Sequence, residues 1–127
     1  MSTRATITAA GAPAAVGPYS HAVRSGELIF CSGQLPIDPA SGQIAGADAG
    51  AQTHRCLENL QAVAEAAGSE LARALRLTVY TTALEQFAQI NEAYARFFAE
   101  EPPARVAVGV AALPRGALVE IDAILPA

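Results

Sequence analysis

The chain has 127 residues, enough for one domain with a real core, and we assign residues 1–127 to a single domain. Its formal net charge is −4, and its eight basic residues are all arginines that stand singly along the sequence. Because binding to nucleic acid or to an anionic membrane needs clustered basic side chains, this distribution argues against both classes of partner.

The N-terminal half predicts a hairpin followed by a helix. The β-rich segment from Glu27 to Ser32 follows a Ser-Gly turn, which indicates a hairpin with residues His21 to Arg24. From Ala49 to Ala67, apolar residues recur at spacings of three and four, as is typical of an amphipathic helix. Asp48 is the expected N-cap, and Gly68 is expected to end the helix.

A strand and a second helix are expected next. Leu75 to Thr81 is rich in residues that favour strands. The sequence Thr82-Ala83-Leu84-Glu85 has the spacing of a capping box, so the second helix is predicted to open there. An apolar stripe at spacings of three and four runs from Phe87 to Phe97, and Pro102-Pro103 prevents any continuation.

The last part of the chain predicts two more strands. Arg105 to Val110 and Val119 to Ile124 both alternate, and a Pro-Arg-Gly turn between them indicates an antiparallel hairpin. The predicted order is three strands, helix, strand, helix and two strands. Such an order favours an α+β fold in which two helices cover one face of a mixed six-stranded sheet. Nothing local covers the other face, and a composition with 52% hydrophobic and 16% charged residues also favours an oligomer.

The sequence contains no pattern typical of membrane insertion, secretion or metal binding. The longest charge-free stretches, Ile29 to Ile37 and Val106 to Pro114, are shorter than the roughly 18 apolar residues that cross a bilayer. The start, Met1 to Arg4, lacks the apolar segment of a secretory signal, so we expect a cytoplasmic protein. Cys31 and Cys56 are expected to be reduced thiols packed as small hydrophobes, and no spacing suggests a metal site.

Arg105 and Glu120 are charged residues placed within strands, and each has two interpretations. The strand face that begins at Arg105 continues with small residues, which leaves space beside a guanidinium, the group best suited to hold a carboxylate. Alternatively, Arg105 is a strand-end residue that pairs with solvent or a surface acid. A half-buried Glu120 would hold a water or act as general acid–base, whereas an exposed one would form a wet face with Asp122.

The predicted terminal hairpin keeps these two residues apart. A turn at the Pro-Arg-Gly triplet pairs residues whose numbers sum to about 230, which places Arg105 opposite residues 124–125 and Glu120 opposite Val110. At that register the two side chains lie roughly 15 Å apart along the hairpin. A site that uses both is therefore more naturally built across a subunit boundary.

Four further residues are candidates for lining a site. Tyr19 follows a rigid Gly-Pro turn, and Ser32 and Gly33 end a β-run where a glycine lets a ligand approach the backbone. Asn91 lies inside the second helix, on or beside its buried stripe, and is expected to hydrogen-bond a specific partner. Each residue also has a purely structural interpretation, as turn packing, a strand end or a helix–loop contact.

Taken together, these segments resemble the Rid family (reactive intermediate deaminase, also called YjgF or L-PSP), and the resemblance spans nearly the whole chain. The segments that carry it are Ala14–Ser20, Phe30–Asp38, Thr53–Gly68, Phe87–Tyr94, Pro103–Arg105, Val108–Pro114 and Glu120–Ile124.

The resemblance implies a chorismate-mutase-like α+β fold and a homotrimer with a central β-barrel. Three clefts at subunit interfaces would hydrolyse 2-iminopropanoate or 2-iminobutanoate to a 2-keto acid and ammonia, with no cofactor and no metal. By position, Arg105 would bind the substrate carboxylate, and Glu120 would position the attacking water and help to move its proton. The residues that would line the cleft are Tyr19, Ser32, Gly33, Asn91 and Ala107.

Two departures from the family pattern concern substrate preference more than reaction type. Ala107 stands where many members carry Cys or Thr, so only a backbone contact to the ligand would survive there. The loop from Ala99 to Pro103 is also shorter than in the best-known members. Two other functions compete with deamination. One is a regulatory trimer that binds keto acids without turnover. The other is an RNA-cleaving translation inhibitor, and the negative net charge of the chain argues against it.

Overall fold

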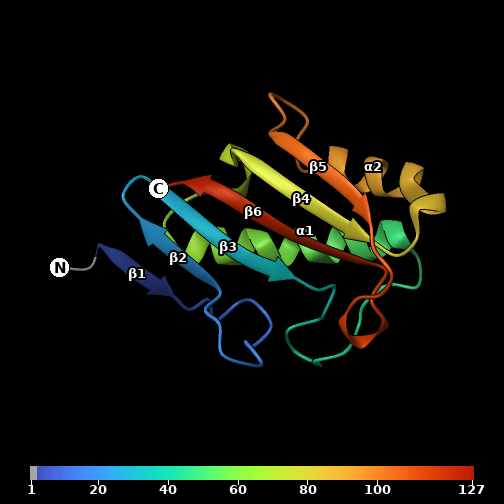
Figure 1. Cartoon of the computed structure of the whole chain (residues 1–127), viewed down its shortest axis with the longest axis horizontal. Coiled ribbons are helices and arrows are strands. Elements are labelled where there is room, and N and C mark those ends of the chain that lie inside the picture. Colours follow the sequence, from blue (N-terminus) through green and yellow to red (C-terminus); the bar gives the residue numbers. More distant parts are fainter. Residues whose placement is uncertain (1–2) are drawn as a thin grey trace.

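The computed structural model describes residues 3–127. Met1 and Ser2, which begin the segment in which we expected no secretory signal, lie outside the described residues. The principal elements are β1 (Arg4–Ile7), β2 (Ala22–Ser25), β3 (Leu28–Gln34), α1 (Ala49–Ala66), β4 (Arg76–Thr81), α2 (Phe87–Ala95), β5 (Ala104–Gly109) and β6 (Val119–Pro126) (Figure 1). Short 3-10 turns lie at Leu71–Arg73, Leu84–Gln86 and Pro114–Gly116.

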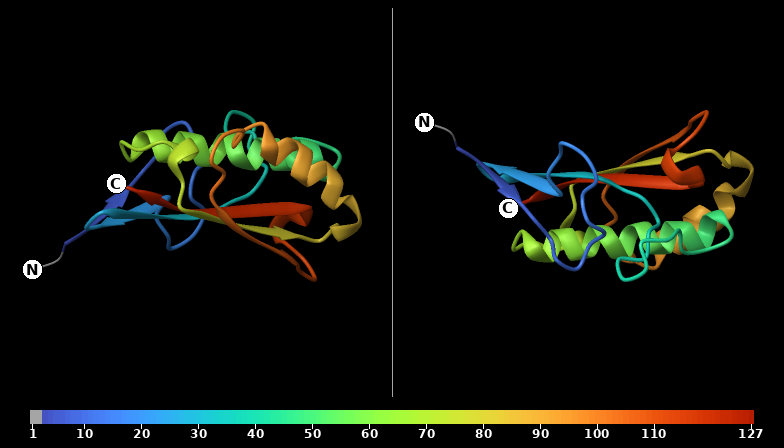
Figure 2. Two further views of the ribbon diagram at one scale, coloured as in Figure 1. Left: turned by 90° about the horizontal axis from the view of Figure 1, so that it is seen from above. Right: turned by 90° about the horizontal axis from the view of Figure 1, so that it is seen from below.

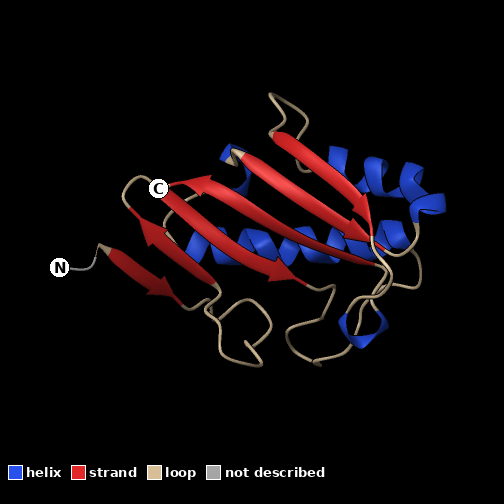
Figure 3. Ribbon diagram, viewed as in Figure 1, coloured by secondary structure: helices blue, strands red, loops and turns tan. Residues whose placement is uncertain are grey.

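The six strands form one mixed sheet in the order β1-β2-β3-β6-β4-β5 (Figure 3). The β4–β5 pair is parallel and is joined by a crossover through α2, whereas the other pairs are antiparallel. Figure 2 shows both helices on the same face of the sheet. The predicted α+β arrangement is therefore confirmed, and so is the hairpin of β2 and β3.

The predicted pairing of the last two strands is wrong. β6 lies between β3 and β4, and β5 pairs with β4, so that Leu77 is opposite Arg105 and Tyr80 is opposite Glu120. Proximity along the chain favours a hairpin, but the inward face of β6 (Val119, Ile121, Ala123, Leu125) is completely apolar and buried. A strand with such a face is most stable in the middle of the sheet beneath α1, where both edges are also paired.

The first helix matches its prediction and the start of the second does not. The Asp48 side chain accepts a hydrogen bond from the Ala51 N–H at 2.8 Å, and Gly68 has the left-handed φ of +79° that ends a helix. The capping box predicted at Thr82 is absent. The Thr82 N–H donates to Leu118 O at 3.1 Å, which keeps it in the sheet, and α2 begins only after the 3-10 turn at Leu84–Gln86.

The helix-free face of the sheet is partly apolar. Its exposed large hydrophobic residues are Leu28, Phe30, Val106 and Val108, on β3 and β5. Cys31 and Cys56 are buried and unpaired, as expected, and burial raises the pKa of Cys31 to about 12. Residues 3–127 contain no group of three or more His, Cys, Asp or Glu side chains that could hold a metal ion. None of the helices in this range combines the length and hydropathy that crossing a membrane requires.

Candidate functional site

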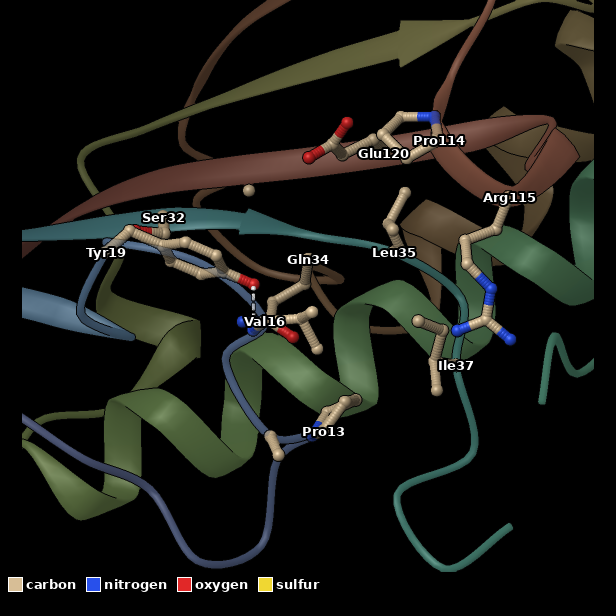
Figure 4. Close-up of a pocket in the computed structure, with 12 residues that line it drawn as sticks. Pro13, Val16, Tyr19, Ser32, Gln34, Leu35, Ile37, Pro114, Arg115 and Glu120 are labelled. Carbon is tan, nitrogen blue, oxygen red and sulfur yellow. Dashed lines mark hydrogen bonds between the residues drawn. The ribbon is translucent and has the colours of Figure 1, made fainter. Parts of the chain in front are cut away.

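A pocket of about 520 Å³ lies where the end of β3 meets the start of β6. The loop before β2 and the turn before β6 complete its walls (Figure 4). Its lining residues are Pro13, Ala14, Val16, Tyr19, Ser32, Gly33, Gln34, Leu35, Ile37, Pro114, Arg115 and Glu120. The structure therefore brings together four of the predicted site residues, Tyr19, Ser32, Gly33 and Glu120. We call these four the Glu120 group.

A β-bulge shapes the floor of this pocket. Cys31 is opposite Ala123, whereas Gln34 is opposite Ile121, so β3 advances three residues while β6 advances two. The extra residue lets both Cys31 and Gln34 be buried on the helix-covered side, although Gln34 also lines the pocket. Ser32, with its neighbour Gly33, is left on the pocket side. Ser32 and Gly33 lie at the end of β3, as predicted, although the bulge itself was not predicted.

Gly33 is required by the position of the Glu120 carboxylate. A Cβ atom at Gly33 would overlap Glu120 Oε2 and would lie 3.1 Å from its carboxyl carbon. We therefore expect Gly33→Ala to displace the carboxylate and to lower the rate of any reaction in which this carboxylate takes part by roughly 10-fold or more, because misplaced reacting groups lose rate steeply. The matched control is Gly11→Ala, whose added Cβ would meet only Ala62 Cβ at an ordinary 3.5 Å. Equal kcat values for the two variants would contradict this requirement.

The loop that carries Tyr19 is anchored by His21, which the sequence did not single out. The buried His21 ring accepts the Ala9 N–H at Nδ1 (2.9 Å) and donates from Nε2 to Pro13 O (2.8 Å), a pair of roles that needs the neutral ring. Both partners are backbone atoms, so no residue type could have indicated them. The isolated histidine is thus structural, and it fixes one wall of the pocket.

Tyr19 and Ser32 make local contacts that shape the same wall. The Tyr19 hydroxyl accepts a hydrogen bond from the Val16 N–H at 3.3 Å (Figure 4). The Ser32 hydroxyl donates to Ser20 O at 2.6 Å and so ties the loop to β3. Tyr19 remains 48% exposed, so its ring and its hydroxyl proton are accessible to a ligand.

The Glu120 side chain is half-buried and has an unusual proton affinity. Burial raises the pKa of its carboxyl above the ordinary value of 4.5, and the neighbouring Asp122 carboxylate raises it further. A carboxylate in such a position is a stronger base than a solvated one, which suits it to accept a proton from water. The half-buried state required for a functional Glu120 is therefore present, and the alternative of a fully wet strand face is not.

Arg105 lies on the other face of the sheet, with residues of α2. Its Nη1 donates to Asn91 Oδ1 at 2.8 Å, and its Cζ lies 4.9 Å from the Tyr94 ring centroid and 5.3 Å from that of Phe87. Asn91 is thus exposed and contacts a side chain rather than a neighbouring loop. Arg105, Asn91, Phe87 and Tyr94 form what we call the Arg105 group. Ala107 is half-buried on the same strand face and lies beside the Arg105 group. Neither Ala107 nor any residue of the Arg105 group lines the pocket.

The two groups cannot meet within one chain. Leu77 and Arg105 share the helix-covered face, whereas Tyr80 and Glu120 share the other. Arg105 and Glu120 are also two strands and three residue steps apart, which corresponds to roughly 14 Å between their backbones. The predicted separation of Arg105 and Glu120 was based on a wrong strand pairing. The two residues are nevertheless far apart, and the sheet also lies between their side chains.

Comparison with known proteins assigns the family. A family model described as Endoribonuclease L-PSP matches residues 9–126. The RutC family protein y4sK of Sinorhizobium fredii is 51% identical over 119 residues (94% of both chains), and the 2-iminobutanoate/2-iminopropanoate deaminase of Salmonella typhimurium is 43% identical over 122 residues (94% of both).

Solved structures agree in fold. RidA from a Psychrobacter species superposes with a TM-score of 0.92 at 43% identity and covers 97% of this chain and 99% of its own. TdcF of E. coli, solved with bound serine, superposes with a TM-score of 0.90 at 40% identity and covers 97% and 98%. The family model, the relatives and the solved structures all match this chain over nearly its whole length. The chain therefore belongs to the Rid family, also known as the YjgF or L-PSP family.

Proposed function

We propose that this chain is an enzyme that hydrolyses the C=N bond of 2-imino acids, such as 2-iminopropanoate and 2-iminobutanoate, to 2-keto acids and ammonia. The observation that carries the proposal is the division of the site residues into two incomplete groups. The Glu120 group holds a basic carboxylate in a pocket, and the Arg105 group holds a guanidinium on the opposite sheet face. A relative 43% identical over 122 residues bears the name of this deaminase, which supports the same chemistry.

In the proposed mechanism the Arg105 group binds the substrate carboxylate. One guanidinium N–H is engaged by Asn91, and the rings of Phe87 and Tyr94 restrict its rotation. A guanidinium carries five N–H donors, so a pair remains for a bidentate contact with the acid. The residues that hold Arg105 therefore preorganise it without consuming its binding capacity.

Glu120 acts on the water. An imine is already electrophilic, so the enzyme has only to hold the carboxylate, place one water beside the imine carbon and accept its proton. Glu120 takes that proton as water adds to the C=N bond and passes it to the nitrogen, which gives the tetrahedral carbinolamine. It then takes the hydroxyl proton as the C=O bond forms and the C–N bond breaks, and passes it to the nitrogen, which leaves as ammonia. Tyr19, Ser32 and Gly33 bound the space in which the intermediate forms, and the backbone of Ala107 contributes from the Arg105 side.

A homotrimer is the proposed assembly, with the three helix-free sheet faces forming a central β-barrel. It would cover Leu28, Phe30, Val106 and Val108, which are 38–45% exposed in the single chain. Each interface would then place the Arg105 group of one protomer over the Glu120 group of the next. The proposed ligands are thus 2-imino and 2-keto acids, and the proposed setting is the cytoplasm.

Complementation between two inactive variants tests the shared site. Arg105→Ala and Glu120→Gln protomers are expected to be inactive separately. In a random 1:1 mixture, unfolded and refolded together, roughly a quarter of the interfaces should pair an intact Arg105 with an intact Glu120 and recover about that share of wild-type activity towards freshly generated 2-iminopropanoate. Absence of recovery in mixed oligomers would contradict a shared site.

The wild-type protein in the same assay separates the competing functions. Keto-acid binding without any acceleration of imine hydrolysis over buffer would favour the regulatory binder. Cleavage of RNA that persists in the Arg105→Ala variant would favour the nuclease.

A further inference from the structure

Asp122 is a second carboxylate on the strand face of Glu120. The two residues are separated by one position on β6, both are half-buried, and their backbones lie roughly 6.6 Å apart. The Tyr80 hydroxyl donates a hydrogen bond to Asp122 Oδ2 at 3.0 Å. Because Tyr80 is also directly opposite Glu120 in the β4–β6 register, the Asp122 carboxylate is held on the same patch as the catalytic candidate.

The residues that flank Glu120 on the neighbouring strands carry no positive charge, and the arginine on this face of β4, Arg76, is opposite Ile124, four positions along β6 from Glu120 and two from Asp122. On the β3 side, the nearest residue is Gly33, and on the β4 side, Thr78 and Tyr80 are neutral. The electrostatic influences on the Glu120 pKa are burial first and Asp122 second. Burial first, and then the hydrogen bond and charge of Asp122, raise the pKa of the Tyr80 hydroxyl, which keeps it protonated as the donor of the bond.

Two other ionisable groups lie near Glu120, and neither offsets the negative charge of Asp122. Arg115 lines the same pocket, but its Nη2 donates to Gly42 O at 2.9 Å, on the loop across from β6. Cys56 is on α1 behind the sheet, and burial, followed by the charge of Glu120, raises its thiol pKa well above the ordinary value. It therefore stays neutral at physiological pH.

We propose that Asp122, oriented by the Tyr80 hydroxyl, is a positioning residue that acts on the reaction through Glu120 and makes its carboxylate a stronger base. The inference rests on the proposed function, because it assigns Glu120 the task of accepting a proton from water. A fixed negative charge beside Glu120 disfavours its ionised form, so the proton, once taken from water, is held more firmly. Asp122 itself contacts neither the water nor the imino acid.

The direct test measures the Glu120 carboxyl without any substrate. The protein is labelled with ¹³C at the glutamate side-chain carboxyl, the Glu120 resonance is assigned by its loss in Glu120→Gln, and its chemical shift is followed over pH. In wild type, the Glu120 midpoint should lie above 4.5, the ordinary value. Asp122→Asn should lower it, because the neighbouring negative charge is lost. Asp122→Glu, which keeps the charge, should restore it.

A matched control separates this contact from net charge. Glu65→Gln removes the same charge from an exposed position on α1, in the helix layer, and should leave the Glu120 midpoint where it is. Equal shifts in Asp122→Asn and Glu65→Gln, or no shift in a folded Asp122→Asn, would overturn the proposal. If Asp122→Asn does not fold, the wild-type titration still decides, because a Glu120 midpoint at or below 4.5 is incompatible with it.

The kinetic counterpart is the acid limb of the kcat–pH profile. In Asp122→Asn this limb should move to lower pH by the same amount as the Glu120 midpoint, and the plateau kcat should fall roughly two- to three-fold because the base is weaker. A midpoint that moves while the limb does not would overturn the role in the reaction. If wild type hydrolyses no imine, the proposed function fails, whereas the ¹³C titration still reports whether Asp122 controls Glu120.

Discussion

Arg105→Ala is expected to lower kcat/KM for 2-iminopropanoate by roughly 100-fold or more, because two charge-assisted hydrogen bonds to the substrate carboxylate are lost. The proposed trimer should stay intact, since Arg105 is exposed and donates its hydrogen bond to Asn91 on the same protomer. Steady-state kinetics give the first quantity, and sedimentation velocity gives the second.

Two companion variants make this result specific. Arg96→Ala removes another exposed arginine next to α2, one that forms an ion pair with Glu92 at 3.2 Å, and should leave kcat/KM within about two-fold of wild type. Arg105→Lys keeps the charge without the planar fork and should lie between alanine and wild type. Wild-type kinetics in Arg105→Ala would remove this guanidinium from the mechanism.

Glu120→Gln is expected to lower kcat by roughly 100-fold or more, since general acid–base catalysis contributes about 10²- to 10⁴-fold. Glutamine has nearly the same shape as glutamate, so the pocket should remain and the Kd of a keto acid should change by less than about three-fold. Stopped-flow assay of imine loss and calorimetric titration of pyruvate measure the two quantities. Equal losses in both would contradict a role in positioning the water.

The pH dependence of kcat gives the same variant a second readout. Burial and Asp122 raise the Glu120 pKa above 4.5, so in wild type the base becomes protonated, and kcat falls, at a higher pH than for a solvated glutamate. The residual activity of Glu120→Gln should lack this acid limb, because glutamine does not titrate.

Local sequence patterns are sufficient to predict much of the fold. Spacings of three and four locate both helices, and Asp48 and Gly68 locate the ends of the first to within a residue or two. The Ser-Gly turn locates the β2–β3 hairpin. Alternation also places Arg105 on one strand face with Ala107, and Glu120 on one strand face with Asp122, because side-chain direction depends only on the local period of two.

Strand pairing is harder to predict because distant contacts determine it. Residues 105–110 and 119–124 have the pattern of a hairpin, but burying the apolar face of β6 beneath α1 outweighs the short connection. The capping box at Thr82 fails for a similar reason, since its N–H is taken by Leu118 across the sheet. The short β1 is largely exposed and has no alternating pattern by which its bounds could be predicted.

The residues of the candidate site were likewise predictable only in part. Tyr19, Ser32, Gly33 and Glu120 are identified by resemblance to the family, and the structure brings them into one pocket. Nothing in the sequence indicates that Arg115 joins them, because its position depends on a contact with Gly42, 73 positions away in the sequence. The anchoring role of His21 is equally hidden, since the atoms that it binds are main-chain atoms.

The placement of Arg105 and Glu120 on opposite sides of one β-sheet has a consequence for activity at low protein concentration. In the proposed shared site, a solitary protomer carries both groups and still lacks a complete catalytic centre. Turnover per protomer would therefore decline on dilution, following the dissociation constant of the assembly rather than the integrity of the fold. Expression level would in this way regulate specific activity with no effector molecule.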